Sequence, residues 1–392
     1  MKTVAVIFGG RSTEHDVSVV TALASIIKPL ELSGEYSVCP VYISRDGAWY
    51  WDARLKDIKL FSSGKIDDFI RTATPAGVQF QGGKGGMALT RATRFGKQSR
   101  VKIDIVFPAT HGTFGEDGRL MGLLDMAGVP YVGCGQAASV LAMDKVLAKL
   151  MAESHGIPIA KFQYFSRQKV QQDPAFVIKK SLEKLKFPLF VKPAHLGSSI
   201  GISRANDKKE LENALEVAAH YDDKILVEEA VNNLIEVTLP IIGNDEPRPA
   251  LLEKPLTNPE DFFDFETKYM KGGKKGGKGK GGGAKGAQGY SQLPAELPKA
   301  LYDKAVQTGL DVYKALGCSG IARVDMLIDS KTNQVYFNEV NPLPGSLYAH
   351  NWRSAGLSSI DLVKQLVGYA EERFAAEQKL TTSFETNYLK QF

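Results

Sequence analysis

An apolar run at the start of the chain is followed by two glycines and then by an amphipathic stretch, and this order limits the fold more than any other feature. Residues 2–8 are predicted as a strand, and an apolar stripe of Val17, Val20 and Leu23 predicts a helix up to about residue 27. Strands that alternate with helices are typical of a parallel α/β layer, in which ligands bind at the carboxyl ends of the strands. Further strands are expected at 36–43 and 103–108, with a helix from about residue 119.

The second half of the chain has a different pattern, because its apolar runs follow one another with fewer helices between them. A chain of 392 residues is too long for one hydrophobic core and fits two or three domains. The sequence therefore predicts an α/β first part and an α+β C-terminal part. The expected helices are 136–154, 208–219 and 359–376, and the expected strands are 187–192, 200–203, 225–229, 236–242, 322–328 and 335–341.

Two segments lack a clear period. Residues 81–100 are rich in glycine and basic residues, and we interpret them as a loop or excursion. Residues 271–289 contain ten glycines and six lysines without one acidic residue, so this tract cannot form a packed core and is expected to be a mobile loop within the C-terminal part. The tract accounts for the formal net charge of +5, and the remainder of the chain is close to neutral. A broad nucleic-acid-binding surface is therefore not expected.

The cysteines and the N-terminus favour a cytoplasmic protein. Cys39, Cys134 and Cys318 are far apart in the sequence and form no pair with the spacing of metal ligands, which suits a reducing compartment. The apolar run at the N-terminus is too short for a signal-peptide core or a membrane span. No membrane association is expected.

Three oxygen-bearing side chains near the C-terminus form the most informative pattern. Asp325 lies between apolar neighbours in one predicted strand, and Glu339 and Asn341 share one face of the next strand because alternate residues point the same way. If the two strands pair, these side chains converge in the way that a magnesium ion bound to phosphate requires. The alternative is a surface strand pair with outward polar residues, and the cost of burying unpaired carboxylates favours the metal interpretation.

A lysine and a small-residue turn indicate a phosphate site. Lys192 ends an apolar strand, and a Gly-Ser-Ser-Ile-Gly turn at 197–201 follows it. Small residues let backbone N–H groups approach a phosphate, and the lysine supplies a point charge. A glycine-serine turn alone is weak support, because many hairpins contain one.

Two N-terminal loops carry further candidates. His111 begins a loop with three glycines after an apolar strand, where an α/β ligand site is expected, although a packed histidine is the simpler alternative. Glu14 lies at a helix start in a loop that lacks both common phosphate-loop spacings. Its carboxylate suits a substrate ammonium group better than a phosphate, and helix capping alone is the alternative.

Together these motifs resemble those of the D-alanine–D-alanine ligases, a family of the ATP-grasp superfamily. The resemblance covers nearly the whole chain in the order of the family. The motifs are GGRSTEHDVS at 9–18, HGTFGEDG at 111–118, GVPYVGCG at 128–135, MDK at 143–145, VKPAHLGSSIGI at 191–202, DFETKY at 264–269, ARVDM at 322–326 and NEVNPLPGS at 338–346.

The resemblance implies three domains, with ATP between the last two. The implied bounds are 1–135 for the N-terminal α/β domain, 136–225 for the central lid domain and 226–392 for the C-terminal domain. It also implies two Mg²⁺ or Mn²⁺ ions held by Asp325, Glu339 and Asn341, with ATP as co-substrate. The residues implied in ATP binding are Lys145, Lys192, Glu228, Ala230, Val231, Glu236 and Lys268.

The resemblance further implies a reaction in which one D-alanine is activated as an acyl phosphate and a second D-alanine attacks it. The implied substrate residues include His111 and Ser346, and Glu14 is implied to hold the first ammonium group and to join Ser198 and Tyr269 in closing a loop. Arg323 and the Gly345 backbone N–H are implied to stabilise the tetrahedral intermediate.

The sequence departs from the family pattern at two places, the expected site of the second substrate and the closing loop. His350 stands where a serine that receives the second carboxylate is expected, so D-lactate, D-serine or another amino acid is the alternative acceptor. The tract 271–289 extends the closing loop, either as a mobile positive cover or as a solvated insertion. A third interpretation, a binding module that uses this tract on nucleic acid, is disfavoured by the near-neutral remainder of the chain. A homodimer is a further expectation from the family.

Overall fold

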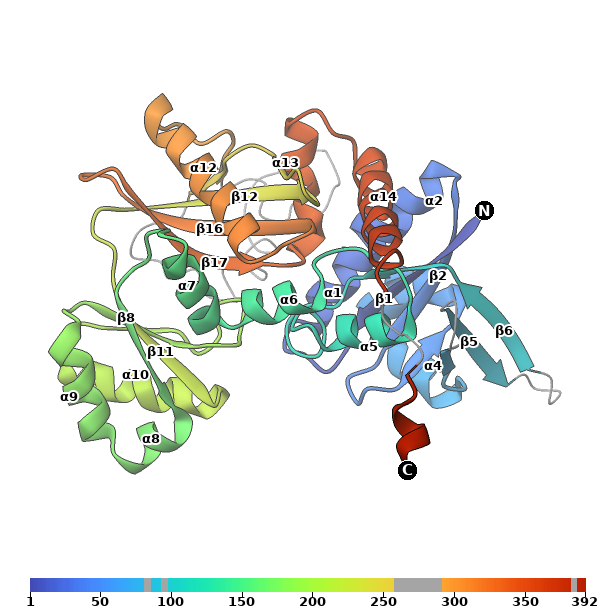
Figure 1. Ribbon diagram of the computed structural model, residues 1–392, viewed down its shortest axis with the longest axis horizontal. Helices are drawn as coiled ribbons and strands as arrows, with labels where there is room; N and C mark the ends of the chain where they lie inside the picture. Colours follow the sequence, from blue (N-terminus) through green and yellow to red (C-terminus); the bar gives the residue numbers. More distant parts are fainter. Residues whose placement is uncertain (81–85, 93–97, 257–290, 382–385) are drawn as a thin grey trace.

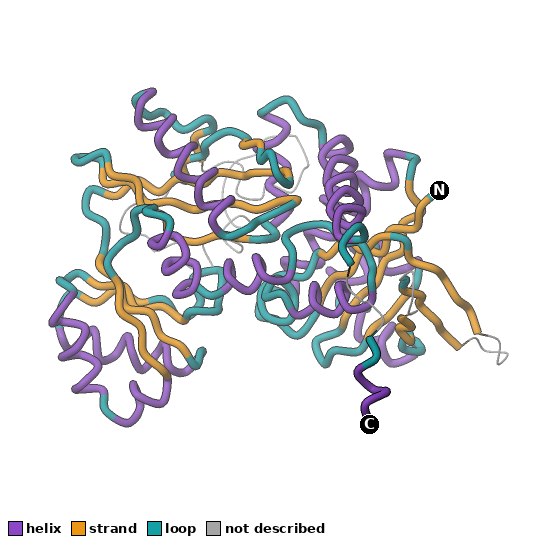
Figure 2. Tube along the Cα trace, in the orientation of Figure 1, coloured by secondary structure: helices purple, strands orange, loops and turns teal. Residues whose placement is uncertain are grey.

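The computed structural model describes residues 1–80, 86–92, 98–256, 291–381 and 386–392, and it contains three bodies that each combine a sheet with helices (Figures 1 and 2). Lys268, Tyr269 and the tract 271–289 lie outside the described residues. Within the described part of the chain no helix is long and apolar enough to cross a membrane. The three cysteines are free and buried.

The N-terminal body contains the expected parallel layer. Its strand order is β3-β2-β1-β7, and β1 pairs in parallel with both β2 and β7. The helix after the glycine turn is longer than predicted and ends before Gly34, which takes a left-handed conformation with φ 67°. The elements are β1 (Lys2–Gly9), α1 (His15–Val20), the π-helical η1 (Thr21–Ile27), α2 (Lys28–Ser33), β2 (Tyr36–Ile43), β3 (Trp49–Trp51), η2 (Ala53–Lys56), α3 (Ile58–Ser62), α4 (Ile66–Thr72), β7 (Ile105–Pro108) and α5 (Arg119–Ala127).

The two faces of this sheet are covered by different helices. Alternate residues Val4 and Val6 of β1 pack with α1, η1 and α2, while Ala5 and Ile7 pack with α5. The terminal helix α14 (Ser359–Glu377) also reaches the first face, where it lies beside α2 (Figure 1). The C-terminal part of the chain therefore helps to bury the N-terminal sheet.

The interpretation of residues 81–100 as a loop was wrong for the part that the structure describes. Strands β4 (Gly77–Phe80), β5 (Met87–Ala92) and β6 (Gln98–Ile103) form an antiparallel sheet. Met87 and Leu89 of β5 are buried against the parallel layer. Their burial stabilises strands that the glycine-rich, basic composition had concealed.

The central body has an antiparallel sheet of order β10-β9-β11-β8. Strand β11 crosses the predicted boundary between residues 225 and 226, and it pairs with both β9 and β8. The sheet of this body thus continues beyond residue 225. Its elements are β8 (Phe162–Ser166), α8 (Arg167–Gln172), α9 (Pro174–Lys184), β9 (Leu189–Pro193), β10 (Ser203–Ala205), α10 (Lys208–Tyr221) and β11 (Lys224–Glu229).

The C-terminal body has a sheet of order β13-β12-β16-β17 with α12 packed on its apolar face. The helix predicted over 136–154 is broken at Asp144 into α6 and α7. Both helices pack into this core, and Val146 of α7 also packs against the central sheet. The elements are α6 (Gln136–Met143), α7 (Lys145–Ser154), β12 (Leu234–Gly243), β13 (Arg248–Pro249), β14 (Lys254–Pro255), β15 (Ser291–Gln292), α12 (Lys299–Ala315), β16 (Gly320–Asp329), β17 (Gln334–Asn341), η4 (Gly345–Tyr348), α13 (Ala349–Ser354), α14 and η5 (Tyr388–Gln391).

Candidate active site

The paired strands β16 and β17 bring the three predicted metal ligands onto one face. Asp325 lies opposite Glu339, and Arg323 lies opposite Asn341, so all four side chains leave the sheet on the same side. The Asn341 amide Nδ2 is 3.1 Å from Asp325 Oδ2, and Arg323 donates to both Asp325 oxygens at 2.7 and 2.5 Å. Two carboxylates and an amide oxygen within one half-buried face form a set of hard oxygen donors that fits Mg²⁺ or Mn²⁺.

Two predicted lysines border this acidic face. Lys145, at the start of α7, lies with its Nζ 3.1 Å from Glu339 Oε2 and donates to the Leu196 carbonyl at 2.7 Å. Lys192, at the end of β9, contacts the Asn338 side chain at 3.3 Å and forms an ion pair with Glu228. The two ammonium groups therefore lie between the central sheet and the acidic strands.

Glu228 is also paired with Lys149, which the sequence reasoning missed. Lys149 Nζ lies 2.9 Å from Glu228 Oε2, and their side chains are only 1% and 2% exposed. Burial raises the pKa of Glu228, but the two lysine charges outweigh burial and hold that pKa at about 2. Burial lowers the pKa of Lys149, while the carboxylates raise that of Lys192 despite its burial. The four-residue spacing from Lys145 to Lys149 was the available signal, since it places both on one side of a helix.

The small-residue loop after β9 reaches across to the N-terminal body. Ser198 donates a hydrogen bond to the Glu14 carboxylate, and Ser198 and Ser199 take left-handed conformations with φ 53° and 58°. A side chain at Gly197 would place its Cβ 3.0 Å from Glu14 Oε2, and one at Gly112 would approach the same atom to 2.9 Å. Glu14 is thus enclosed by two glycine-containing loops and is 8% exposed.

A buried set of polar groups lies behind Glu14. His111 Nδ1 is 3.7 Å from Glu116 Oε2, and its Nε2 is 2.9 Å from the Thr21 hydroxyl. Burial, together with the nearby charge of Glu116, raises the pKa of Glu14. Burial lowers the pKa of His111, but the hydrogen bond and charge of Glu116 outweigh it and the net shift is upward. Glu116 and Thr21 were not predicted, although Glu116 is part of the same loop as His111.

The segment after β17 is held by contacts near both of its ends. At its start the Ser346 backbone N–H donates to Thr21 Oγ1 at 3.0 Å. Three successive residues, Ser346, Leu347 and Tyr348, have φ between 52° and 53°, a strained arrangement that persists only when surrounding contacts impose it. Gly345 opens this segment, and a Cβ there would lie 3.9 Å from Val17 Cγ1. The Arg323 guanidinium lies 5.1 Å from the centre of the Tyr348 ring.

The His350 imidazole is paired with the carboxylate of Glu253, a partner that the sequence did not predict. Its Nε2 lies 2.9 and 3.1 Å from the two oxygens of Glu253, which is 4% exposed, and the imidazole lies 4.7 Å from the Tyr348 ring. The buried Asn351 donates to Glu253 Oε2 at 3.1 Å. Burial raises the pKa of Glu253, but the His350 hydrogen bond and charge outweigh it and the pKa is lowered. Arg323, Tyr348 and His350 therefore form one continuous polar and aromatic wall.

The remaining predicted ATP residues lie at the end of β11 and on β12. Ala230 and Val231 follow β11, and the Ala230 backbone N–H donates to the Pro188 carbonyl at 3.0 Å. Glu236 lies on β12 opposite Leu327, close enough to contribute to the raised pKa of Lys192. Lys268 and Tyr269 are outside the described residues.

Two family descriptions match most of the chain. "D-ala D-ala ligase N-terminus" matches residues 3–134, and "D-ala D-ala ligase C-terminus" matches residues 151–368. Among curated relatives, the D-alanine–D-alanine ligase of Acetivibrio thermocellus is 37% identical over 387 residues, covering 95% of this chain and 96% of the relative. The corresponding ligase of Chloroherpeton thalassium is 35% identical and covers 97% and 98%.

Solved structures with the same fold include two ligases. The D-alanine-D-alanine ligase from Coxiella burnetii is similar with a TM-score of 0.75 at 26% identity, covering 97% of this chain and 98% of that one. The VanG D-Ala:D-Ser ligase from Enterococcus faecalis is similar with a TM-score of 0.74 at 31% identity, covering 94% and 99%.

Proposed function

The chain belongs to the D-alanine–D-alanine ligase family, whose members are ATP-dependent and release ADP, and from this premise we propose which of its residues perform each part of the reaction. Its fold is the ATP-grasp fold of the ligases that it resembles in structure. The family serves peptidoglycan synthesis, and ATP and D-alanine are its substrates.

Glu14 receives the ammonium group of the first D-alanine. The contacts of Glu14 support this role, because its carboxylate accepts a hydrogen bond from Ser198 and lies close against Gly112 and Gly197, where larger side chains would crowd it. His111 and Glu116 keep the charge balance behind Glu14. The first substrate's carboxylate then attacks the terminal phosphate of ATP and forms an acyl phosphate.

Lys145 and Lys192 bind the phosphates of ATP. The family resemblance adds Lys268 to the ATP-binding residues and Tyr269 to the partners of Ser198, and both lie outside the described residues. We place the adenine beside Glu228, Ala230 and Val231 and the ribose toward Glu236. Ala230 and Val231 lie in the connection between β11 and β12, and Glu228 and Glu236 lie on those two strands. Asp325, Glu339 and Asn341 would hold Mg²⁺ or Mn²⁺, proposed as two ions per site, and the bound ions would neutralise the charge of the transferring phosphate.

Arg323 and the Gly345 backbone N–H stabilise the oxyanion when the second substrate's amine attacks the acyl carbon. Arg323 is fixed by two hydrogen bonds to Asp325, so its guanidinium costs little reorganisation during the reaction. Ser346 and His350 lie along the same segment and receive the second substrate. We place the protein in the cytoplasm, and a homodimer is its proposed assembly.

One observation carries the proposal. Ser198 in the central body bonds to Glu14 in the N-terminal body, while Lys145 on the neighbouring helix contacts both Glu339 and the Leu196 carbonyl. The proposed sites for the first amino acid, the phosphates and the metal ions thus meet at the loop that contains Ser198. Closure of the site over the bound substrates would keep water away from the acyl phosphate.

The same chemistry with a different acceptor is the second candidate, and His350 favours it. An imidazole backed by Glu253 differs in size and charge from the expected serine. D-lactate and D-serine are therefore acceptors to compare with D-alanine.

Release of ADP, coupled to product identification, tests the proposal. Purified protein is supplied with ATP, Mg²⁺ and either D-alanine alone or D-alanine mixed with D-lactate or D-serine. We expect D-alanyl-D-alanine and ADP in equal amounts with D-alanine alone. No turnover with D-alanine alone, but turnover with a mixture, would transfer the assignment to the second candidate. Absence of ADP release in every mixture would refute both.

A further inference from the structure

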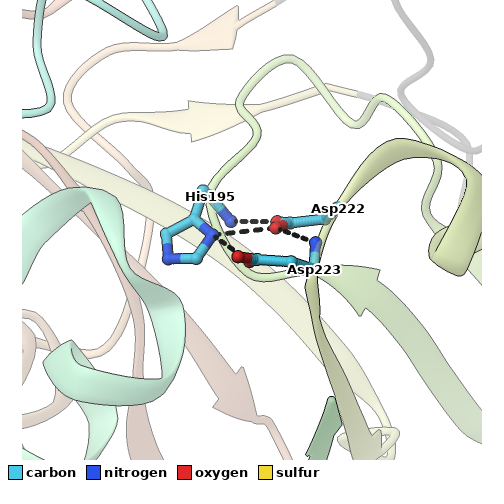
Figure 3. Close-up of side chains that lie close together, drawn as sticks. All are labelled: His195, Asp222 and Asp223. Atoms are coloured by element: carbon cyan, nitrogen blue, oxygen red, sulfur yellow. Dashed lines mark hydrogen bonds and ion pairs between the residues drawn. The ribbon is translucent and has the colours of Figure 1, made fainter. Parts of the chain in front are cut away.

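A histidine that the reaction scheme does not use lies beside the phosphate-binding lysines. His195 follows β9, immediately before the small-residue loop, and its side chain is 36% exposed. Three carboxylates face it: Asp144 at the start of α7, and Asp222 and Asp223 at the turn between α10 and β11. The ammonium group of Lys224 pairs with Asp144. Figure 3 shows the imidazole Nδ1 facing the carboxylates of both Asp222 and Asp223.

Both ring nitrogens of His195 face carboxylate oxygens. Nδ1 lies 2.8 Å from Asp222 Oδ1, and Nε2 lies 3.2 Å from Asp144 Oδ2. A carboxylate only accepts hydrogen bonds, so both nitrogens must carry a proton for both contacts to form. Neutral imidazole would direct a lone pair at one carboxylate. The geometry therefore requires the doubly protonated imidazolium.

The titration of the group agrees with this geometry. The hydrogen bonds that His195 donates to Asp144 and Asp222 raise its pKa to about 9, against the opposing effect of burial. Burial raises the pKa of Asp222, but the hydrogen bonds from His195 outweigh it and lower that pKa to about 2. The imidazolium is thus the main form of His195 at neutral pH.

His195, Asp222 and Asp223 also have the composition of a metal site, since their ligand atoms lie within 4.8 Å of one another. Their other contacts argue for a proton instead. Asp222 already accepts from the backbone N–H groups of His195 and Asp223, each at 2.7 Å, and Asp144 is paired with the Lys224 ammonium group. Asp223 itself is 86% exposed. The negative charges of the carboxylates are thus balanced by the His195 imidazolium and the Lys224 ammonium group.

The contacts of Asp144 connect this cluster to the phosphate site. Asp144 Oδ1 caps α7 by accepting from the Val146 and Leu147 backbone N–H groups at 2.9 and 3.1 Å, while its Oδ2 faces His195. The next residue, Lys145, donates its backbone N–H to the Ala194 carbonyl at 3.0 Å and its Nζ to the Leu196 carbonyl at 2.7 Å. The chain on both sides of His195 is therefore bound to Lys145.

We propose that His195 is a positioning residue, whose doubly hydrogen-bonded imidazolium fixes residues 194–199 against the start of α7 and so holds Lys145 and Ser198 in place for the nucleotide and the first substrate. This inference rests on the proposed function of those two residues. His195 itself lies behind the lysine and contacts neither substrate in this assignment.

The experiment compares H195Q, H195R and the control H220Q, which changes an exposed histidine on the neighbouring helix α10. Glutamine can donate to only one carboxylate side, so H195Q is expected to raise KM for ATP about tenfold. H195R retains a permanent cation and several donors, so it is expected to keep near-normal KM at pH 7. H220Q is expected to match the wild type.

The pH dependence separates positioning from a purely structural effect. Because the pKa of His195 is raised from 6.5 to about 9, the imidazolium contacts are fully present below pH 6.5 and are lost as the pH rises through about 9. The wild-type kcat/KM for ATP should therefore decrease as the pH rises through about 9, and H195R should not show this alkaline limb of the pH profile. Histidine-selective NMR, assigned with H195Q, should show one imidazole that titrates near pH 9.

The outcomes are distinguishable from failure of the proposed function. Titration of His195 near its ordinary value of 6.5, or unchanged KM and pH profile in H195Q, would overturn the inference while ligation persists. An alkaline limb in H195R identical to that of the wild type would also overturn it. If H195Q does not fold, H195R supplies both the kinetic comparison and the assignment of the His195 resonance for the NMR titration. If the wild type releases no ADP with D-alanine, the proposed function fails, and the titration together with ATP binding by H195R still tests the positioning role.

Discussion

Substitutions in the buried triad of Lys149, Lys192 and Glu228 should affect stability very unequally. Glu228 neutralises one of two ammonium groups that are almost fully enclosed, so E228Q leaves two buried like charges without their carboxylate. K149M instead leaves one ammonium group and one carboxylate, which remain paired. The direction of the difference follows from charge alone, because both substitutions nearly preserve side-chain length.

The expected magnitudes come from the burial of the groups. Removing one partner of a buried ion pair costs about 3–5 kcal/mol, whereas replacing a buried charge with a well-packed apolar group is often close to neutral. A chain of 392 residues that unfolds as one unit has an unfolding entropy of about 0.8 kcal/mol/K, so each kcal/mol lowers Tm by roughly 1.2 °C. E228Q should therefore lower Tm by about 4–6 °C, and K149M by roughly 1 °C or less.

Thermal unfolding of both variants without nucleotide is the assay, and E183Q is the matched control. Glu183 pairs with Lys180 at 2.7 Å on the surface, and that loss should leave Tm unchanged. The sign of the pH dependence is also defined. Because the pKa of Glu228 is lowered from 4.5 to about 2, its contribution is present above pH 4.5 and is lost as the pH falls toward 2. Equal Tm values for E228Q and K149M, or a larger loss for K149M, would refute this reasoning.

Three further predictions concern the site. S198A removes the hydrogen-bond donor to Glu14 and should lower kcat/KM for the first D-alanine about tenfold or more without a change in Tm. Steady-state kinetics measure the change, and an unchanged kcat/KM would count against loop closure through Glu14. E253Q weakens the contact between Glu253 and His350 and should raise KM for the second substrate about fivefold, while KM for the first substrate stays constant. Equal changes in the two KM values would contradict a role of His350 in binding the second substrate. D325N should reduce activity about a hundredfold and raise the Mg²⁺ concentration needed for half-maximal rate, whereas D329N, at the last residue of the same strand, should do neither. A normal Mg²⁺ titration of D325N would exclude Asp325 as a ligand.

The strand pair that carries the proposed metal ligands was predictable because strand periodicity is a local property. Asp325, Glu339 and Asn341 alternate with buried apolar residues in both β16 and β17, and the structure places them on one half-buried face. The parallel N-terminal layer was predictable for the same reason, since its strands and helices alternate along the chain.

The parts that escaped prediction depend on contacts between distant segments. Asp144 reads as an interior residue of one long helix, yet it ends α6 and caps α7 because His195 and Lys224 hold its carboxylate. Helix α12 was not predicted, since small residues such as Ala305 and Gly309 supply part of its contact face and give a weak apolar signal. Glu253 supports His350 from almost a hundred residues away, so no local pattern could link them.

The central claim is that the carboxylate of the first D-alanine is activated by attack on the terminal phosphate of ATP. D-alanine labelled with ¹⁸O in its carboxylate tests this most directly, with ATP and Mg²⁺ present. The claim predicts that one labelled oxygen appears in inorganic phosphate for each dipeptide formed, because the acyl C–O bond breaks when the second amine displaces phosphate. Dipeptide formation with unlabelled phosphate, or with AMP and pyrophosphate in place of ADP, would contradict it.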